Sequence, residues 1–179
     1  MRKSLLHFFS TLSLTLVGFI SISSCSFGAV EPKIDREKRD QLIERYDLLN
    51  FPNIQQPILL TIDEFFDGNN DVASIAPNLD TKPAIKEYFR TLKIIADNPK
   101  TTAAYVKIKD VLVNTDGQLM DDAWLYTDMI YFIGDLSRED IIKATKSLKP
   151  DEVEYDPENE IRVLRDEYKD KKIVYLWWD

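Results

Sequence analysis

The sequence predicts an α+β domain with a ferredoxin-like, split βαβ topology: an antiparallel sheet with helices on one face, plus an extra N-terminal helix. Two observations predict this class. Strand-like and helical segments follow one another in the order strand, helix, strand, strand, helix, strand. The two most apolar runs, 58–62 and 128–133, are also the ones that this topology places at the centre of the sheet, parallel to each other.

Three stretches have the apolar spacing of amphipathic helices. The extra helix follows Asp35. The next begins after Thr81 and Pro83, and the last follows the capping residue Ser137 and ends before Pro150. The apolar stripes are Leu42, Ile43, Tyr46 and Leu49; Ile85, Phe89, Leu92 and Ala96; and Ile141, Ile142, Thr145 and Leu148.

Four runs predict strands. Residues 58–62 are apolar at almost every position, which fits a central strand buried on both faces, whereas 103–113 alternate and carry lysines on one face. Lysines on a strand are typical of a protected edge. A long loop should join 103–113 to 128–133 in a hairpin, and residues 171–179 supply the last strand.

Two connecting segments complete the domain. Thr61 and Glu64 have the spacing of a capping box, so a short helical turn is expected directly after the first strand. The acidic stretch 151–160, part of a charged segment that runs to 170, is most simply a solvated loop. Its alternative use is to meet a basic partner.

The N-terminus has the layout of a secretory signal, with Arg2 and Lys3 before an apolar run. Ile22-Ser23-Ser24-Cys25 resembles the lipobox of bacterial lipoproteins. This resemblance implies removal of residues 1–24, lipidation of Cys25, a tether over 25–34 and a single domain over 35–179. Ordinary cleavage nearby and an uncleaved anchor are the alternatives.

The resemblance also implies a location. Residue 26 is Ser, and lipoproteins with Asp at this position are the ones kept at the inner membrane. We therefore expect an outer-membrane lipoprotein facing the periplasm, held to the membrane by its lipidated N-terminus. The inner membrane and the soluble periplasm are the alternative locations.

Net charge indicates the kind of partner. Removal of residues 1–24 takes away two basic residues and no acidic one, so 21 basic and 31 acidic side chains remain, a formal charge of −10. Such a charge argues against nucleic acid as a partner, because the phosphate backbone would be repelled. It favours basic proteins or metal cations.

Several catalytic chemistries are excluded by composition. The only histidine, His7, lies in the signal segment, and the only cysteine is Cys25. The domain therefore lacks the residues for a Ser-His-Asp triad, a Cys-His pair, or a zinc site built from imidazole or thiolate. Its few scattered glycines form no phosphate-binding loop, so we expect no cofactor and no enzymatic activity of these kinds.

Two acidic loops are candidates for other chemistry. Asp67, Asn69 and Asp71 have the spacing of half a calcium loop, but Val72 stands where glycine is needed, so a solvated turn is favoured and no metal site is predicted. A second loop carries Asp121, Asp122 and Asp128 around Trp124. Paired carboxylates beside an indole occur in glycosidases, although turn-forming aspartates and a packed tryptophan explain the pattern more simply.

Aromatic and acidic residues are the candidates for partner binding. The C-terminal strand places large side chains on both of its faces, and one face must be core. Aromatic side chains left exposed would be interface anchors. The candidates are Trp124, Tyr175, Trp177 and Trp178, together with the acidic residues Asp151, Glu152 and Glu154.

Four segments resemble a group of uncharacterised small acidic bacterial proteins. They are Phe65-Phe66-Asp67-Gly68-Asn69, Ser74-Ile75-Ala76-Pro77-Asn78-Leu79, Asp121-Asp122-Ala123-Trp124 and Trp177-Trp178-Asp179. The resemblance covers roughly residues 58–179 and carries no catalytic residues. The leading functional hypothesis is a non-enzymatic, lipid-anchored envelope protein that binds a protein partner, such as an immunity-type inhibitor of a basic toxin or enzyme. A carboxylate-dependent hydrolase of envelope glycans and a structural envelope protein are the alternatives.

Overall fold

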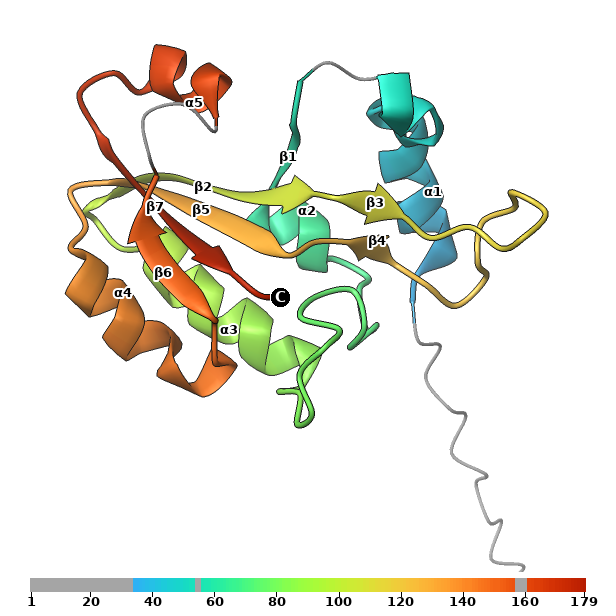
Figure 1. Cartoon of the computed structure of the whole chain (residues 1–179), viewed down its shortest axis with the longest axis horizontal. Helices are drawn as coiled ribbons and strands as arrows, with labels where there is room; N and C mark the ends of the chain where they lie inside the picture. Colours follow the sequence, from blue (N-terminus) through green and yellow to red (C-terminus); the bar gives the residue numbers. More distant parts are fainter. Residues whose placement is uncertain (1–33, 54–55, 157–160) are drawn as a thin grey trace, which may run out of the picture. The chain divides into compact units, whose positions relative to one another are not determined.

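The computed structural model describes residues 34–53, 56–156 and 161–179 (Figure 1). Its helices are α1 (Arg36–Arg45), α2 (Ile62–Phe66), α3 (Ile85–Ala96), α4 (Arg138–Thr145) and α5 (Arg162–Glu167), with 3-10 segments η1 (Leu48–Asn53) and η2 (Lys146–Leu148). Its strands are β1 (Ile58–Thr61), β2 (Thr101–Ile108), β3 (Asp110–Val111), β4 (Leu125–Tyr126), β5 (Met129–Gly134), β6 (Glu152–Tyr155) and β7 (Lys172–Trp177). The predicted signal peptide, Cys25 and the tether up to residue 33 lie outside the described residues.

An antiparallel sheet confirms the α+β class. In the described part of the chain its strand order is β1-β2-β5-β7-β6. The predicted hairpin is confirmed, because β2 pairs antiparallel with β5, and β3 and β4 extend this hairpin as a two-stranded ribbon. The ferredoxin-like order is wrong, because β1 pairs antiparallel with β2 at one edge of the sheet and β2 separates it from β5.

The apolar composition of β1 has a cause other than a central position. Ile58 and Leu60 are buried in the main core, on the side of the sheet where α2 packs. Leu59 points to the opposite face and is partly buried there. An edge strand with one buried face and one half-covered face therefore has the same apolar run as a central strand.

Strand β6 corrects the prediction of a solvated loop over the acidic segment. Val153 is buried between the exposed Glu152 and the half-buried Glu154, so the alternation of a strand is present within an acidic composition. Pairing with β7 brings Val153 opposite Leu176 and gives the sheet its second edge. Burial of one apolar side chain and a row of backbone hydrogen bonds outweighs the solvation of the neighbouring acids.

Helices cover both faces of the sheet, which corrects the prediction that they lie on one. The helices α2, α3 and α4 contribute to the main core together with Leu60, Val106 and Phe132 of the sheet. The short helix α5 lies on the opposite face, where Ile161 and Leu164 form a second apolar cluster with sheet residues (Figure 1). The members of this cluster from the sheet are Tyr131, Ile133, Ile173 and Tyr175.

The predicted starts of α1, α2 and α4 are confirmed at the level of hydrogen bonds, whereas α3 begins after Ala84, which makes no side-chain capping bond. The Asp35 side chain accepts from Lys38 N at 3.2 Å at the start of α1, and Ser137 accepts from Asp140 N at 3.1 Å at the start of α4. At α2 both bonds of the capping box between Thr61 and Glu64 are present. Capping satisfies amide groups that have no partner inside the helix.

Packing joins the described residues into one compact unit. At its centre Tyr88 of α3 and Trp178 meet edge to face, with ring centroids 6.0 Å apart. Burial raises the pKa of Tyr88 to about 12. Among the helices of the described ranges, none combines the length and the apolar composition that a membrane crossing requires.

Candidate protein-binding site

Side chains of β6 and β7 meet at the edge of the sheet. Glu152 lies opposite Trp177, and Glu154 lies opposite Tyr175. Residues directly opposite on antiparallel strands point to the same face, with Cβ atoms about 5 Å apart. The tertiary structure therefore combines the acidic segment and the C-terminal aromatic run, which are separate in the sequence, into one surface.

Trp177 is the partly exposed aromatic residue of this surface. Along β7 the side chains of Leu176 and Trp178 point into the main core, whereas those of Tyr175 and Trp177 point to the face that carries α5. Tyr175 is 8% exposed, and its ring lies 6.4 Å from that of Tyr131. Trp177 lies farther along the strand and keeps part of its ring accessible.

The three predicted acidic residues differ in how their charges are used. Glu154 forms an ion pair with Arg138, and Asp151 Oδ2 accepts a hydrogen bond from Asp179 N at 2.9 Å. Glu152 is exposed, and within the described ranges it has neither an ion pair nor a hydrogen-bonded partner for its side chain. Glu152 is therefore the carboxylate of the three that remains free for an incoming cation.

Arg138 is a residue of this edge that the sequence reasoning missed. Its Nε donates to Val153 O at 2.6 Å, its guanidinium pairs with Glu154, and its backbone N donates to the Tyr155 hydroxyl at 3.2 Å. The side chain thus occupies a carbonyl that an edge strand would otherwise leave unpaired. The sequence contains a signal for this contact, because Arg138 is a cation in the first turn of a helix. A cation there is electrostatically unfavourable, which indicates an acceptor outside the helix.

A half-exposed indole beside an unpaired carboxylate suits a guanidinium or ammonium group. The cation can lie over the ring face while its N–H groups bond to the carboxylate. Tryptophan and arginine are also the residues most enriched among those that dominate interface energies. Trp177 and Glu152 therefore have the chemistry of an anchor for a basic partner.

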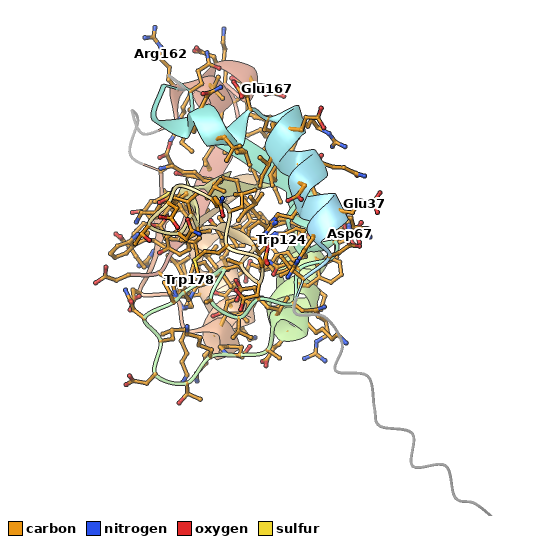
Figure 2. All side chains as sticks on the ribbon, turned by 90° about the vertical axis from the view of Figure 1, so that its right-hand side faces the viewer. Glu37, Asp67, Trp124, Arg162, Glu167 and Trp178 are labelled. Atoms are coloured by element: carbon orange, nitrogen blue, oxygen red, sulfur yellow. The ribbon has the colours of Figure 1, made fainter. Side chains whose placement is uncertain are left out.

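Two of the predicted aromatic residues belong to the core. Trp124 is 1% exposed and Trp178 is 0% exposed, and both lie within the mass of side chains (Figure 2). Trp178 Nε1 donates to Leu148 O at 3.0 Å, and Trp124 N donates to Asp71 Oδ2 at 3.1 Å. Neither indole offers surface to a partner, so both are removed from the candidate site.

The carboxylates of the second acidic loop have structural partners. Asp121 lies 3.6 Å from Arg36 in an ion pair between exposed side chains. Asp128 is 6% exposed and accepts from Lys109 Nζ, a hydrogen bond that raises the pKa of Lys109. Because Trp124 is buried, its indole is not available beside these groups for a sugar to stack on.

The loop with the half pattern of a calcium site is folded inward. Asn69 and Asp71 are 3% and 1% exposed. Asp71 Oδ1 accepts from Ala73 N at 3.0 Å, and Oδ2 accepts from the backbone of Trp124. Asp67 instead points outward and pairs with Lys38 at 2.6 Å. Within the described ranges, no group of three or more acidic, histidine or cysteine side chains is arranged to hold a metal ion.

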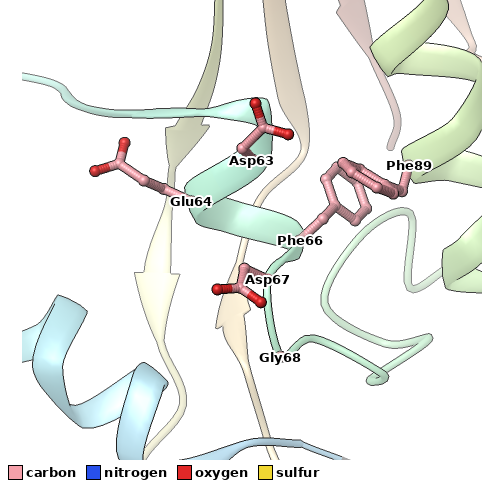
Figure 3. A pocket seen from close by; sticks show the side chains of 6 residues that line it. All are labelled: Asp63, Glu64, Phe66, Asp67, Gly68 and Phe89. Atoms are coloured by element: carbon pink, nitrogen blue, oxygen red, sulfur yellow. The ribbon is translucent and has the colours of Figure 1, made fainter.

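A hollow of about 460 Å³ lies beside α2 (Figure 3). It was not predicted from the sequence. Phe66 and Phe89 form its apolar part, with ring centroids 5.6 Å apart. Its carboxylates are already paired within the chain: Asp63 with Lys93, Glu64 with Arg45, and Asp67 with Lys38. Figure 3 shows the three carboxyl groups pointing in different directions, so they do not converge on one ligand.

Comparison with known protein families gives a match. The model of the Uncharacterized protein YfbO family matches residues 37–173. This range contains α1 without its first residue, the helices α2 to α5, and all of the sheet except the last part of β7. No curated protein and no solved structure matches the chain.

Proposed function

The chain belongs to the Uncharacterized protein YfbO family, and from its geometry we propose that it is a non-enzymatic binding protein whose β6–β7 edge captures a basic protein partner. One observation carries the proposal: Glu152, whose carboxylate has no partner among the described residues, lies opposite the partly exposed Trp177 on the neighbouring strand. An arginine or lysine of the partner stacks on the indole and pairs with the carboxylate.

Charge supports the choice of a basic partner. The chain has 31 acidic and 23 basic residues, a formal net charge of −8. A negative field of this kind speeds the encounter with a positively charged protein and lowers the rate for acidic ones. An immunity-type protein, which occludes a basic toxin or enzyme, uses fast electrostatic capture followed by a central aromatic anchor.

The location proposed for this binding is the cell envelope. The sequence resembles a lipoprotein signal up to Cys25, and lipidation there would hold the domain next to the membrane. Mass spectrometry of the N-terminal peptide from protein isolated from its own cells tests this step. An acylated Cys25 supports it, and an unmodified Met1 overturns it, without bearing on whether β6 and β7 bind a partner.

Capture and titration test the binding proposal. The detergent-solubilised full chain, tagged at its C-terminus, is used to recover partners from its own cells, and the affinity for a recovered basic protein is measured by calorimetry. We expect Trp177→Ala or Glu152→Gln to weaken binding at least tenfold, since central aromatic anchors and desolvated charge pairs each contribute about 2 kcal/mol or more.

Two matched controls separate this surface from general effects. Asp116→Asn changes the net charge by the same amount as Glu152→Gln but lies in the exposed 114–118 turn, so it should leave affinity within about twofold. Trp177→Phe keeps an aromatic face and should retain most of the binding. Equal affinities of the native chain, Trp177→Ala and Glu152→Gln would overturn the proposal.

A further inference from the structure

A stripe of four residues on one side of α4 and η2 faces the edge strand β6. Arg138, Ile142 and Lys146 recur at intervals of four residues, which places them above one another on a helix, and Lys149 follows directly after the end of η2. The inner stripe of the same helix, with Ile141, is buried against the main core. The four residues therefore lie beside the buried stripe and overhang β6, on which α4 packs.

Between this stripe and β6 the surface contains a hollow of about 320 Å³. Ile142, Val153 and Pro150 form its apolar part, and Arg138, Lys146 and Lys149 supply its positive charges. Val153 is 7% exposed, whereas Ile142 is 40% exposed and leaves the hollow open to solvent. A concave site with an apolar floor and converging cations is the usual form of a site for a small anionic ligand.

The three cationic side chains differ in their hydrogen bonds and ion pairs. The guanidinium of Arg138 is fixed by Val153 O and Glu154. Lys146 and Lys149 have neither an ion pair nor a hydrogen-bonded side-chain partner in the part of the chain that the structure describes. The one carboxylate of the hollow, Asp151, already accepts a hydrogen bond from Asp179 N. Within the described residues, two lysines without a carboxylate partner therefore line this one hollow.

Lysines near the end of a helix also have an ordinary role, because they complement the negative end of the helix dipole. Lys143 performs this role in α4 without lining the hollow. Lys146 and Lys149 differ from Lys143, because they lie near the helix end and also line the same hollow. Lys149 is held there by a left-handed backbone conformation, with φ of +50°.

We propose that the hollow between α4 and β6 binds a phosphate group, with Lys146 and Lys149 as its charged ligands and Arg138 as a fixed donor at its side. A phosphate offers several oxygen acceptors at once, which suits cations that approach from different positions. The apolar floor of Ile142 and Val153 is suited to a hydrocarbon group attached to the phosphate, as in a lipid headgroup. The hollow shares Arg138 and Asp151 with the edge described above but includes neither Glu152 nor Trp177, and the proposal does not depend on the binding of a protein there.

Calorimetric titration of the full chain in an uncharged detergent tests the proposal with two probes. Inorganic phosphate represents a free anion, hexyl phosphate represents a phosphate that carries a hydrocarbon chain, and hexanol controls for transfer into the detergent. Saturable binding of hexyl phosphate at least tenfold tighter than inorganic phosphate identifies a lipid-like source. Equal affinities for the two probes identify free phosphate.

Variants assign the binding to the hollow. Replacing both lysines, with Lys146→Gln and Lys149→Gln, should weaken the binding of either probe at least tenfold. The control Lys143→Gln removes one lysine charge from α4, outside the hollow, and should leave affinity unchanged. Ile142→Ser should weaken hexyl phosphate alone if the apolar floor contributes. All these side chains are exposed, so the fold should persist, as circular dichroism would verify. Absence of saturable binding, or equal binding by the native chain and the double variant, would overturn the proposal.

Discussion

At the scale of single residues, buried polar groups determine how the loops are held. Arg39 of α1 is 4% exposed, and its Nη1 donates to Met120 O at 2.7 Å and to Ala123 O at 2.9 Å. The carboxylate of Asp71 holds the same segment by accepting a hydrogen bond from Trp124 N. One buried guanidinium and one buried carboxylate thus hold the two ends of the Met120–Trp124 segment through its backbone.

Arg39→Met is expected to lower the free energy of unfolding by about 2–4 kcal/mol, because it removes the two hydrogen bonds from the guanidinium to the loop, together with the ion pair to Asp40, and leaves the buried carbonyl of Ala123 without this donor. Arg36→Met, on the same helix, is the matched control. Its side chain is 57% exposed and its ion pair with Asp121 lies at the surface, so the loss should stay below about 1 kcal/mol. Urea unfolding of both variants provides the measurement. Equal losses would show that Arg39 does not hold the loop.

At the scale of the elements, the hairpin of β2 and β5 depends on a close backbone contact at its open end. Gly134 at the end of β5 has φ of +153°, and a Cβ built on it would lie 2.1 Å from Lys100 O. Thr101, the first residue of β2, lies opposite Gly134. The strands can approach this closely only because residue 134 has no side chain.

Gly134→Ala is expected to cost about 3 kcal/mol or more, since the backbone atoms of Lys100 and Thr101 must move away from residue 134 at this end of the hairpin. Gly117→Ala is the control for the effect of positive φ alone. Gly117 also has a positive φ, of +76°, but its added Cβ meets nothing within 4 Å, so the cost should be about 1 kcal/mol. Thermal unfolding of the two variants separates steric from conformational cost. A larger loss at Gly117 would contradict the close contact at Gly134.

At the scale of the whole molecule, two adjacent tryptophans have opposite roles. Trp178 is fully buried between α3 and the end of η2, and its backbone N also donates to Asp128 O at 3.0 Å. Trp177 lies on the other face of β7 and is partly exposed. This segment therefore closes the main core with Trp178 and presents part of the preceding residue, Trp177, at the surface.

Trp178→Ala is expected to destabilise the fold by about 3–5 kcal/mol, the usual range for removing a buried large aromatic side chain. Trp177→Ala should cost about 1–2 kcal/mol, because less of its surface is buried. Chemical unfolding measures both values on the same chain. If Trp177→Ala were the more destabilising substitution, its place on the proposed binding surface would have to be abandoned.

The sequence alone was sufficient for the features that depend on neighbouring residues. The apolar stripes located α1, α3 and α4, and the side chains of Asp35, Thr61 and Ser137 located helix starts. These features depend on contacts between residues three or four positions apart, so local spacing determines them. The absence of histidine and cysteine from residues 35–179 likewise limits the available chemistry without reference to the fold.

Only the tertiary structure decided which segments lie side by side. The apolar run of β1 is compatible with a central or an edge position, and the acidic composition of β6 concealed a strand whose alternation depends on one buried valine. The same limit applies to the site: Trp177 and Trp178 are neighbours in the sequence, and only the direction of β7 decides which one is exposed. Strand pairing joins residues far apart in the chain, and its energy depends on burial that no local pattern specifies.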